Sequence, residues 1–221
     1  MKDEFKATKD FVKFLHQVYG LFLDGSRAFP LLREQIIEAQ ERIKKTDNIP
    51  IADLDRRVCF IGSGNPNNKK EALLYHIASQ GEVKERNIND GRNLCFLGNM
   101  CLVWIYQLWE DKFRQQVAME IGYNNKNQLE LDIMGEIKKY RESIIHHKGQ
   151  AKKEAVNNKI LNWFKRDEII NIDKAKMKVI ITATMNELKS LMKVEIIEKE
   201  KILIKDVILN PYGFRSVFDI N

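Results

Sequence analysis

Apolar positions recur every three to four residues along most of the chain, which is the spacing of amphipathic helices. The longest such run, from about Asn89 to Glu120, has a wide apolar stripe and should form the central helix of a bundle. Glycines mark two expected boundaries: Asp24-Gly25 breaks the N-terminal run, and Gly149 is placed to cap a helix ending near Lys148. The expected helices cover residues 11–22, 26–45, 70–79, 89–120, 129–148, 151–166 and 174–193.

Two stretches depart from helical spacing. Residues 46–68 include a short β-like run, Val58 to Ile61, and are expected to form a long connection over one end of the bundle. The loop that follows this run, 62–68, is rich in glycine but lacks the GxxxxGK[ST] spacing of a phosphate loop, so an ordinary turn is preferred. Near the C-terminus, Ile196-Ile197 and Ile202-Leu203-Ile204 alternate with charges and are candidate strands.

These patterns predict an all-α fold, a helical bundle with long central helices and minor extended segments in the 46–68 loop and near the C-terminus. We expect one domain over 1–221, with a core at about 70–170, N-terminal helices and a loop over 1–69, and a helical or mixed extension over 171–221. The chain has 221 residues, of which 44% are hydrophobic and 31% charged, enough apolar content for a packed core. This composition excludes an intrinsically disordered or low-complexity class.

The sequence offers no sign of export or membrane insertion. Its three cysteines are too few for a disulfide framework and have no Cys/His zinc spacing. The charged start lacks the apolar stretch of a signal peptide, and the most apolar segment, Leu94 to Leu108, is too short to span a bilayer. We therefore expect a reduced, soluble, cytoplasmic protein with no membrane partner and no metal or cofactor.

Basic residues are concentrated in the last two-fifths of the chain. The net charge is +6, from 37 basic and 31 acidic residues, and residues 1–134 are neutral, with 19 of each. The excess is densest over 138–166, where nine basic and two acidic residues give a local charge of +7. Such a density is typical of a surface that binds an RNA phosphate backbone. The side chains expected to contact RNA are Lys138, Lys152, Lys153 and Lys159.

One short segment, Tyr140 to Gly149, combines a guanidinium, two imidazoles and a lysine at the end of a predicted helix. Histidine can accept or donate a proton at neutral pH, and arginine can hold a phosphate bidentately. Arg141 and His146 together suit the attack of an RNA 2′-hydroxyl on its neighbouring phosphate. Positions five apart on an ideal helix differ by about 140°, so the two converge only if the helix ends or kinks near His146 or a second subunit completes the site. Alternatively, Arg141 and the histidines only cap the helix C-terminus, where cations are favoured.

The run Arg141-Glu142-Ser143-Ile144-Ile145-His146-His147-Lys148-Gly149 resembles the Arg-x4–6-His motif of the HEPN superfamily (higher eukaryotes and prokaryotes nucleotide-binding domains). The long preceding helix, with Trp104 to Glu110, is also similar to HEPN proteins of bacterial defence and toxin type. Glu142 stands in a polar slot that is more often Asn, Asp or His, and His147 stands in a slot that is often Asn. The resemblance covers about residues 70–170.

The resemblance implies a helical homodimer that brings two motifs to a shared cleft and cleaves RNA without a metal, and an antitoxin or other regulatory protein as a further partner. It makes His146 the acid and base and Arg141 the ligand of the phosphate and the transition state. Two alternatives stay open: a non-catalytic HEPN-like module that binds RNA, a nucleotide or a protein, and a helical interaction subunit in which Arg141 and His146 are structural. The supporting residues of the site would be Tyr140, Glu142, His147 and Lys148.

Overall fold

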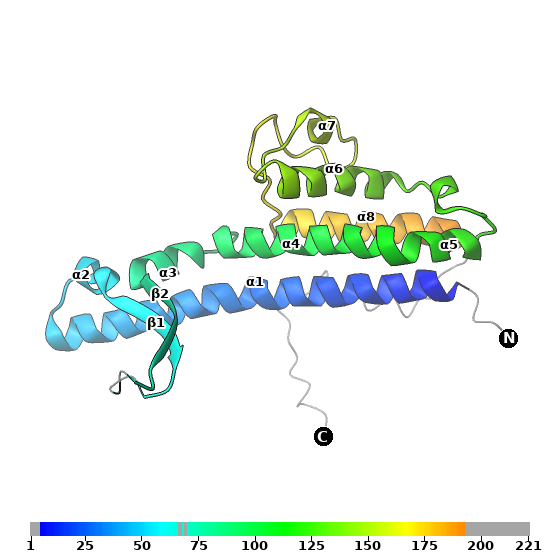
Figure 1. Cartoon of the computed structure of the whole chain (residues 1–221). Helices are drawn as coiled ribbons and strands as arrows, with labels where there is room; N and C mark the ends of the chain where they lie inside the picture. The colour runs from blue at the N-terminus through cyan, green and yellow to red at the C-terminus, as the bar shows by residue number, and fades with distance from the viewer. Residues whose placement is uncertain (1–4, 66–67, 69, 193–221) are drawn as a thin grey trace, which may run out of the picture.

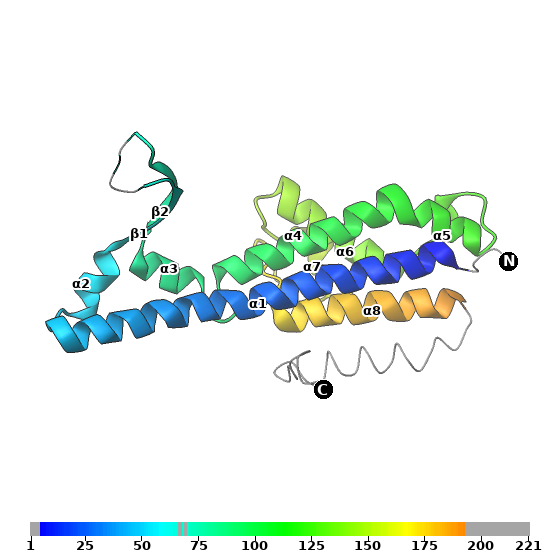
Figure 2. The same cartoon turned by 90° about the horizontal axis from the view of Figure 1, so that it is seen from below.

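The computed structural model describes residues 5–65, 68 and 70–192, which form layers of long helices and one small β-hairpin (Figures 1 and 2). The prediction of a predominantly helical fold is confirmed. No helix in this described part is both long and apolar enough to cross a membrane. The long helical segments are α1 (Lys6–Asp47), α4 (Arg92–Leu108) continuing through a π-helical turn (Trp109–Phe113) into α5 (Arg114–Glu120), α6 (Asp132–His146) and α8 (Lys174–Met192).

Helix α1 is continuous, so the predicted break at Asp24-Gly25 is wrong. The Ser26 hydroxyl donates to the Leu23 carbonyl at 2.7 Å, so this polar group finds its hydrogen-bond partner within the helix. Gly25 instead allows a close approach to α4, because a Cβ at this position would lie 2.4 Å from a methyl carbon of Leu97. Pro30 falls in the first turns of the helix predicted over 26–45, but in the structure it lies inside α1. Glycine here serves helix–helix packing rather than termination.

Residues 58–79 form an antiparallel hairpin of β1 (Val58–Ser63) and β2 (Leu73–Ser79). The β-like run beginning at Val58 is confirmed, whereas the helix predicted over 70–79 is wrong. Its apolar residues fit helical spacing, but they pair across the hairpin, with Phe60 opposite Ile77. The 62–68 loop joins two strands, so it does not have the strand-to-helix setting of a phosphate loop.

Short helices flank this hairpin. Helix α2 (Ile51–Arg56) lies in the segment expected to be a plain connection, and α3 (Gln80–Arg86) follows the hairpin directly. The start of α3 is a capping box, in which the Ser79 hydroxyl accepts the Glu82 backbone N–H and the Glu82 carboxylate accepts the Ser79 N–H. This cap explains why the chain switches from strand to helix at Ser79.

The core is wider than the one expected at about 70–170, because α1 and α8 supply part of it. Phe11 of α1 packs on Trp109 and Phe113, with ring centroids 5.1 and 5.0 Å apart. The π-helical turn places both of these aromatic rings in the core, where they are 2% and 4% exposed. The helix predicted over 89–120 was uninterrupted and did not include this turn. The N-terminal half of α1 is therefore a central element rather than an addition.

The segment between α6 and α8 is mostly irregular. The helix predicted over 151–166 shrinks to one turn, α7 (Lys153–Val156), and the chain between it and α8 has no regular element apart from a β-bridge between Gln150 and Ile169. The Asp173 carboxylate accepts the Lys176 backbone N–H at 2.9 Å, as expected of an N-cap, and α8 follows. The candidate strands at 196–204 lie outside the described residues.

Glu187 on α8 supports the start of α6 from a half-buried position. Its Oε1 accepts the Ile133 backbone N–H at 3.0 Å, whereas its Oε2 is buried with no hydrogen-bond partner among the described residues. Burial raises the pKa of this carboxyl, and the nearby Asp132 and Glu136 carboxylates add to the increase. The folded state therefore favours the protonated form of Glu187.

We expect Glu187→Gln to stabilise the fold at about pH 8 and to have little effect at about pH 4. The wild-type side chain contributes stability below its unfolded pKa and loses it as the pH rises through the raised folded pKa. The amide keeps an acceptor for the Ile133 N–H and carries no charge. Thermal unfolding at both pH values tests this, with Glu154→Gln at an exposed position as the control. Lower stability of Glu187→Gln at the higher pH would contradict the assignment.

Candidate functional site

The C-terminal end of α6 carries the predicted Arg/His segment. The helix ends in a turn in which Lys148 and Gly149 have positive φ angles of 53° and 78°. The Gly149 backbone N–H donates to the Ser143 carbonyl at 3.1 Å, so the predicted glycine cap is confirmed. The side chains of His146, His147 and Lys148 are all exposed at this end. This position places three cationic or ionisable groups where the helix dipole favours positive charge.

Arg141 lies one turn earlier, half-buried between α6 and α4. One terminal nitrogen donates to Gln107 Oε1 at 3.3 Å, and Gln107 in turn donates to Asp111 Oδ2 at 2.6 Å. The Arg141 Nε is buried and has no hydrogen-bond partner among the described residues. The Nε atoms of Arg33 and Arg86 are in the same state, so this feature alone does not mark Arg141 as an anion ligand. Gln107 was not among the site residues predicted from the sequence.

Arg141 and His146 start from different sides of α6. Helix α6 is unbroken up to and including His146. Two positions five residues apart on such a helix differ by about 140° around the axis and about 7.5 Å along it. Helix α6 ends at His146, near the position expected from the sequence, with no kink before it.

Two supporting residues have different surroundings from each other. Tyr140 is fully buried and donates to the Leu161 carbonyl, while its oxygen accepts the Trp163 backbone N–H at 3.4 Å. Burial raises the pKa of this phenol. Glu142 is half-exposed, and its carboxylate lies 3.9 Å from Lys138 Nζ. Tyr140 thus positions the irregular segment that follows α6, whereas Glu142 remains at the surface beside Arg141.

Glu136 fastens the same irregular segment and was not anticipated from the sequence. Its carboxylate, 7% exposed, accepts backbone N–H groups of Lys159, Ile160 and Leu161 at 2.6 to 3.1 Å. These bonds take up main-chain donors that a helix over 151–166 would have used internally. One feature of the sequence could have indicated this role. Glu136 lies one turn before Tyr140, beside the apolar row of α6, and a carboxylate buried at such a position requires hydrogen-bond donors.

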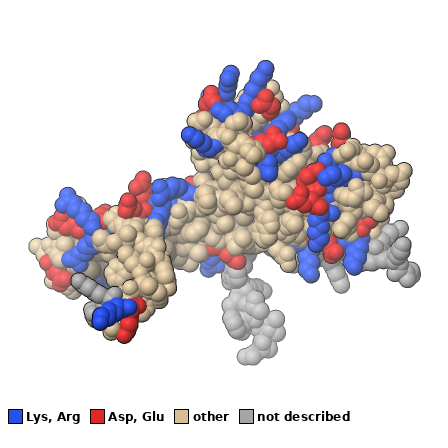
Figure 3. Space-filling model, viewed as in Figure 1, with Lys and Arg blue, Asp and Glu red and all other residues tan. Residues whose placement is uncertain are grey.

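The lysines expected to contact RNA are divided between two places. Lys138 and Lys159 border the groove described below, whereas Lys152 and Lys153 lie at α7. Lys152 pairs with Asp167 at 2.9 Å, and this hydrogen bond holds the pKa of the Asp167 carboxyl below its ordinary value. Figure 3 shows basic side chains projecting from the part of the molecule formed by α6 and α7, with acidic groups among them.

The net charge of the basic region is smaller when α6 and the whole segment up to α8 are counted than when only residues 138–166 are counted. The part of the chain from the start of α6 up to the residue before Asp173, residues 132–172, holds nine basic and six acidic residues, a net charge of +3. The value of +7 for 138–166 arises because four carboxylates lie just outside that window. One of them, Glu136, is buried and bonded to the backbone, and another, Asp167, pairs with Lys152. The surface is basic, but less so than the window indicates.

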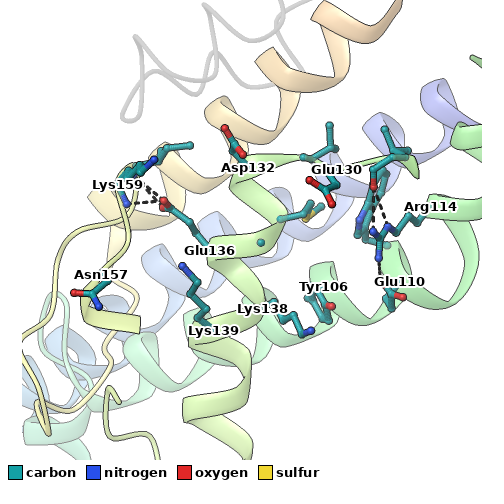
Figure 4. A pocket seen from close by; sticks show the side chains of 16 residues that line it. Tyr106, Glu110, Arg114, Glu130, Asp132, Glu136, Lys138, Lys139, Asn157 and Lys159 are labelled. Carbon is teal, nitrogen blue, oxygen red and sulfur yellow. Dashed lines mark hydrogen bonds and ion pairs between the residues drawn. The ribbon is translucent and has the colours of Figure 1, made fainter. Parts of the chain in front are cut away.

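A groove of about 460 Å³ lies beside α6, between that helix, the π-helical turn and the loop after α7 (Figure 4). Arg114 and Lys126 both pair with Glu110 on one side of it, at 3.0 and 2.7 Å. Burial raises the pKa of Glu110, but the hydrogen bonds from these two cations outweigh it and keep the pKa below its ordinary value. The charged residues that line the groove are Glu110, Arg114, Glu130, Asp132, Glu136, Lys138, Lys139 and Lys159.

The groove and the Arg/His segment are separate, since neither Arg141 nor His146 lines it. Its lining holds four acidic and four basic side chains, so its formal charges are balanced. Within the described residues, no three His, Cys, Asp or Glu side chains are grouped as metal ligands.

Comparisons of the chain with protein-family models, with curated proteins and with solved structures give no match.

Proposed function

We propose that this protein is a HEPN-like, metal-independent endoribonuclease that acts as a homodimer. The observation that supports this best is the presence of the Arg141 guanidinium and the exposed His146 imidazole in the last turns of the same helix, α6. A phosphate oxygen is the kind of acceptor that pairs with such a guanidinium. The exposed His146 imidazole at the end of the same helix supplies the group needed for proton transfer.

In the proposed reaction, His146 removes the proton from an RNA 2′-hydroxyl. The oxygen then attacks the adjacent phosphorus, and the bond from phosphorus to the 5′-oxygen breaks. Arg141 stabilises the negative charge that builds on the phosphoryl oxygens. The same His146 imidazole, now protonated, gives this proton to the leaving 5′-oxygen, so the products are a 2′,3′-cyclic phosphate and a 5′-hydroxyl.

We place the second half of the site on a partner subunit, because positions 141 and 146 lie on different sides of α6. One face of the molecule is suited to such a contact. Met100 and Trp104 on α4 and Ile145 on α6 are apolar side chains 45–49% exposed. Gln107, which holds Arg141, lies on the same exposed side of α4, since it follows Met100 by seven residues. A dimer that covers this face would bring a second α6 end close to the first.

Product chemistry tests the proposal. We expect purified protein to cleave RNA in the presence of EDTA and to leave 2′,3′-cyclic phosphate or 3′-phosphate ends, because the mechanism uses only side-chain acid and base groups. Mass spectrometry of the fragments identifies the ends. Products with 3′-hydroxyl and 5′-phosphate ends would contradict the mechanism, because direct attack by water leaves those ends.

A non-catalytic RNA-binding module is the second candidate. It is favoured by the exposed Glu142 carboxylate beside Arg141, which repels phosphate and lowers the basicity of the surface. RNA binding that weakens steeply with salt, with no cleavage over long incubation, would favour this module over the enzyme.

A further inference from the structure

The groove beside α6 holds charges of both signs that the chain itself does not pair (Figure 4). The carboxylates of Glu130 and Asp132 lie at the start of the helix. The ammonium groups of Lys139, two turns later, and of Lys159 also line the groove. Among the described residues, none of these four side chains forms an ion pair or a hydrogen bond. The groove therefore suits a ligand that is anionic at one end and offers hydrogen-bond donors at the other.

Gly135 lies inside α6 and lines the groove between these charges. Glycine is the least favourable residue after proline for a helix interior. A Cβ at this position would meet no atom within 4 Å, so packing within the chain does not require glycine. The missing side chain leaves the α6 backbone open to the groove, whose volume of about 460 Å³ is typical of a small-ligand site. Gly135 thus leaves room for a ligand against the helix.

The side of α6 that faces the groove continues to the Arg/His segment. Positions 135, 139, 142 and 146 fall within about 60° of one another around an ideal helix. His146 therefore lies on the same side of α6 as Gly135, about 16 Å further along. Lys138 lines the groove, and its Nζ lies 3.9 Å from the Glu142 carboxylate. An RNA strand with a phosphate at His146 would run along this side and place another of its nucleotides in the groove.

We propose that the groove recognises a base of bound RNA, an inference that rests on the proposed ribonuclease. The sugar–phosphate backbone lies along Lys138 and Lys139, and the base packs beside the half-buried Tyr106 ring. Glu130 and Asp132 accept hydrogen bonds from the exocyclic amino group of the base. Uracil has a carbonyl oxygen where cytosine has this amino group, and a carboxylate repels it. The site therefore favours cytosine over uracil.

Binding of two matched oligonucleotides tests this preference. The probes are hexamers of 2′-O-methylcytidine and 2′-O-methyluridine, which differ only in the base edge and cannot be cleaved, because the methyl group blocks attack by the 2′-oxygen. Fluorescence anisotropy at one fixed salt concentration measures their dissociation constants for the full-length protein. We expect the cytidine hexamer to bind about tenfold or more tightly. Glu130→Gln/Asp132→Asn should reduce this ratio to about three or less, since amides donate as well as accept.

A second pair of variants tests the groove itself. Gly135→Gln extends a side chain from α6 into the groove, and we expect it to weaken binding of the cytidine hexamer about tenfold or more. Gly20→Gln on α1 is the matched control, because Gly20 is also inside a helix and a Cβ there also meets no atom within 4 Å. Both substitutions replace a helical glycine with a better helix former, so neither variant should melt below the wild type.

Equal affinity of the wild type for the two hexamers would overturn the proposal, and so would a Gly135→Gln protein that binds the cytidine hexamer as tightly as the wild type. Cytidine 5′-monophosphate that binds as tightly as the hexamer would overturn it in favour of a free nucleotide. None of these measurements depends on cleavage. A cytidine preference that Gly135→Gln abolishes, in a protein that cleaves no RNA, would support the base site and refute the ribonuclease.

Discussion

His146→Ala and Arg141→Ala should each reduce RNA cleavage by about 1,000-fold or more, the largest effects expected of any substitution in this protein. Removal of His146 eliminates the group that takes the 2′-hydroxyl proton, and removal of Arg141 eliminates the cation that stabilises the phosphoryl charge. Arg141→Lys should retain charge but lose the bidentate geometry, and its activity should lie between those of the wild type and Arg141→Ala. Single-turnover cleavage of a labelled RNA measures these rates.

A histidine remote from the site provides the control for this series. His76 lies on β2, where its ring is 3.0 Å from an Arg86 nitrogen, and His76→Ala should change the cleavage rate by less than about tenfold. All variants should keep the wild-type far-UV helical signal, because neither Arg141 nor His146 belongs to the buried core. Undiminished cleavage by both site variants would show that the reactive residues lie elsewhere.

Phe11→Ala should lower the free energy of unfolding by about 3–5 kcal/mol, the largest expected effect on stability. Phe11 is fully buried, and its ring packs against Trp109 and Phe113 at the π-helical turn. The substitution leaves a cavity where α1 meets the central helix, and the rigid neighbouring rings cannot fill it. Urea denaturation followed by tryptophan fluorescence measures the change.

Leu21→Ala on the same helix is the control, because Leu21 is 49% exposed. It should cost less than about 1 kcal/mol. Equal losses for Phe11→Ala and Leu21→Ala would contradict the placement of α1 in the core, since burial is the property that separates the two positions.

The helices that could be predicted from the sequence are those in which apolar residues recur at helical spacing over a long stretch. The central helical segment, α6 with its Gly149 cap, and α8 after Asp173 all lie where apolar spacing and capping residues indicate. Each of these elements buries one continuous stripe, so local pattern and tertiary packing favour the same structure.

Other features depend on contacts between residues far apart in the sequence and could not be predicted from the local sequence pattern. Gly25 resembles a helix breaker in sequence, but it is a contact point for Leu97 across the helix interface. The segment after α6 is irregular because Glu136 binds its backbone donors, although its own apolar spacing favours a helix. In the candidate site, the Arg/His segment lies at a helix end as predicted, but the link from Arg141 to Gln107 needed the packing of α4 on α6.

Complementation between inactive variants tests the central claim, that the reactive site is formed by two subunits. Arg141→Ala and His146→Ala proteins are mixed, allowed to exchange subunits, and assayed together with each variant alone. In a mixed dimer, one of the two sites has an intact Arg141 from one chain and an intact His146 from the other. Random pairing should restore about a quarter of wild-type activity. Subunit exchange that is complete, yet restores no cleavage from two inactive variants, would contradict a shared site.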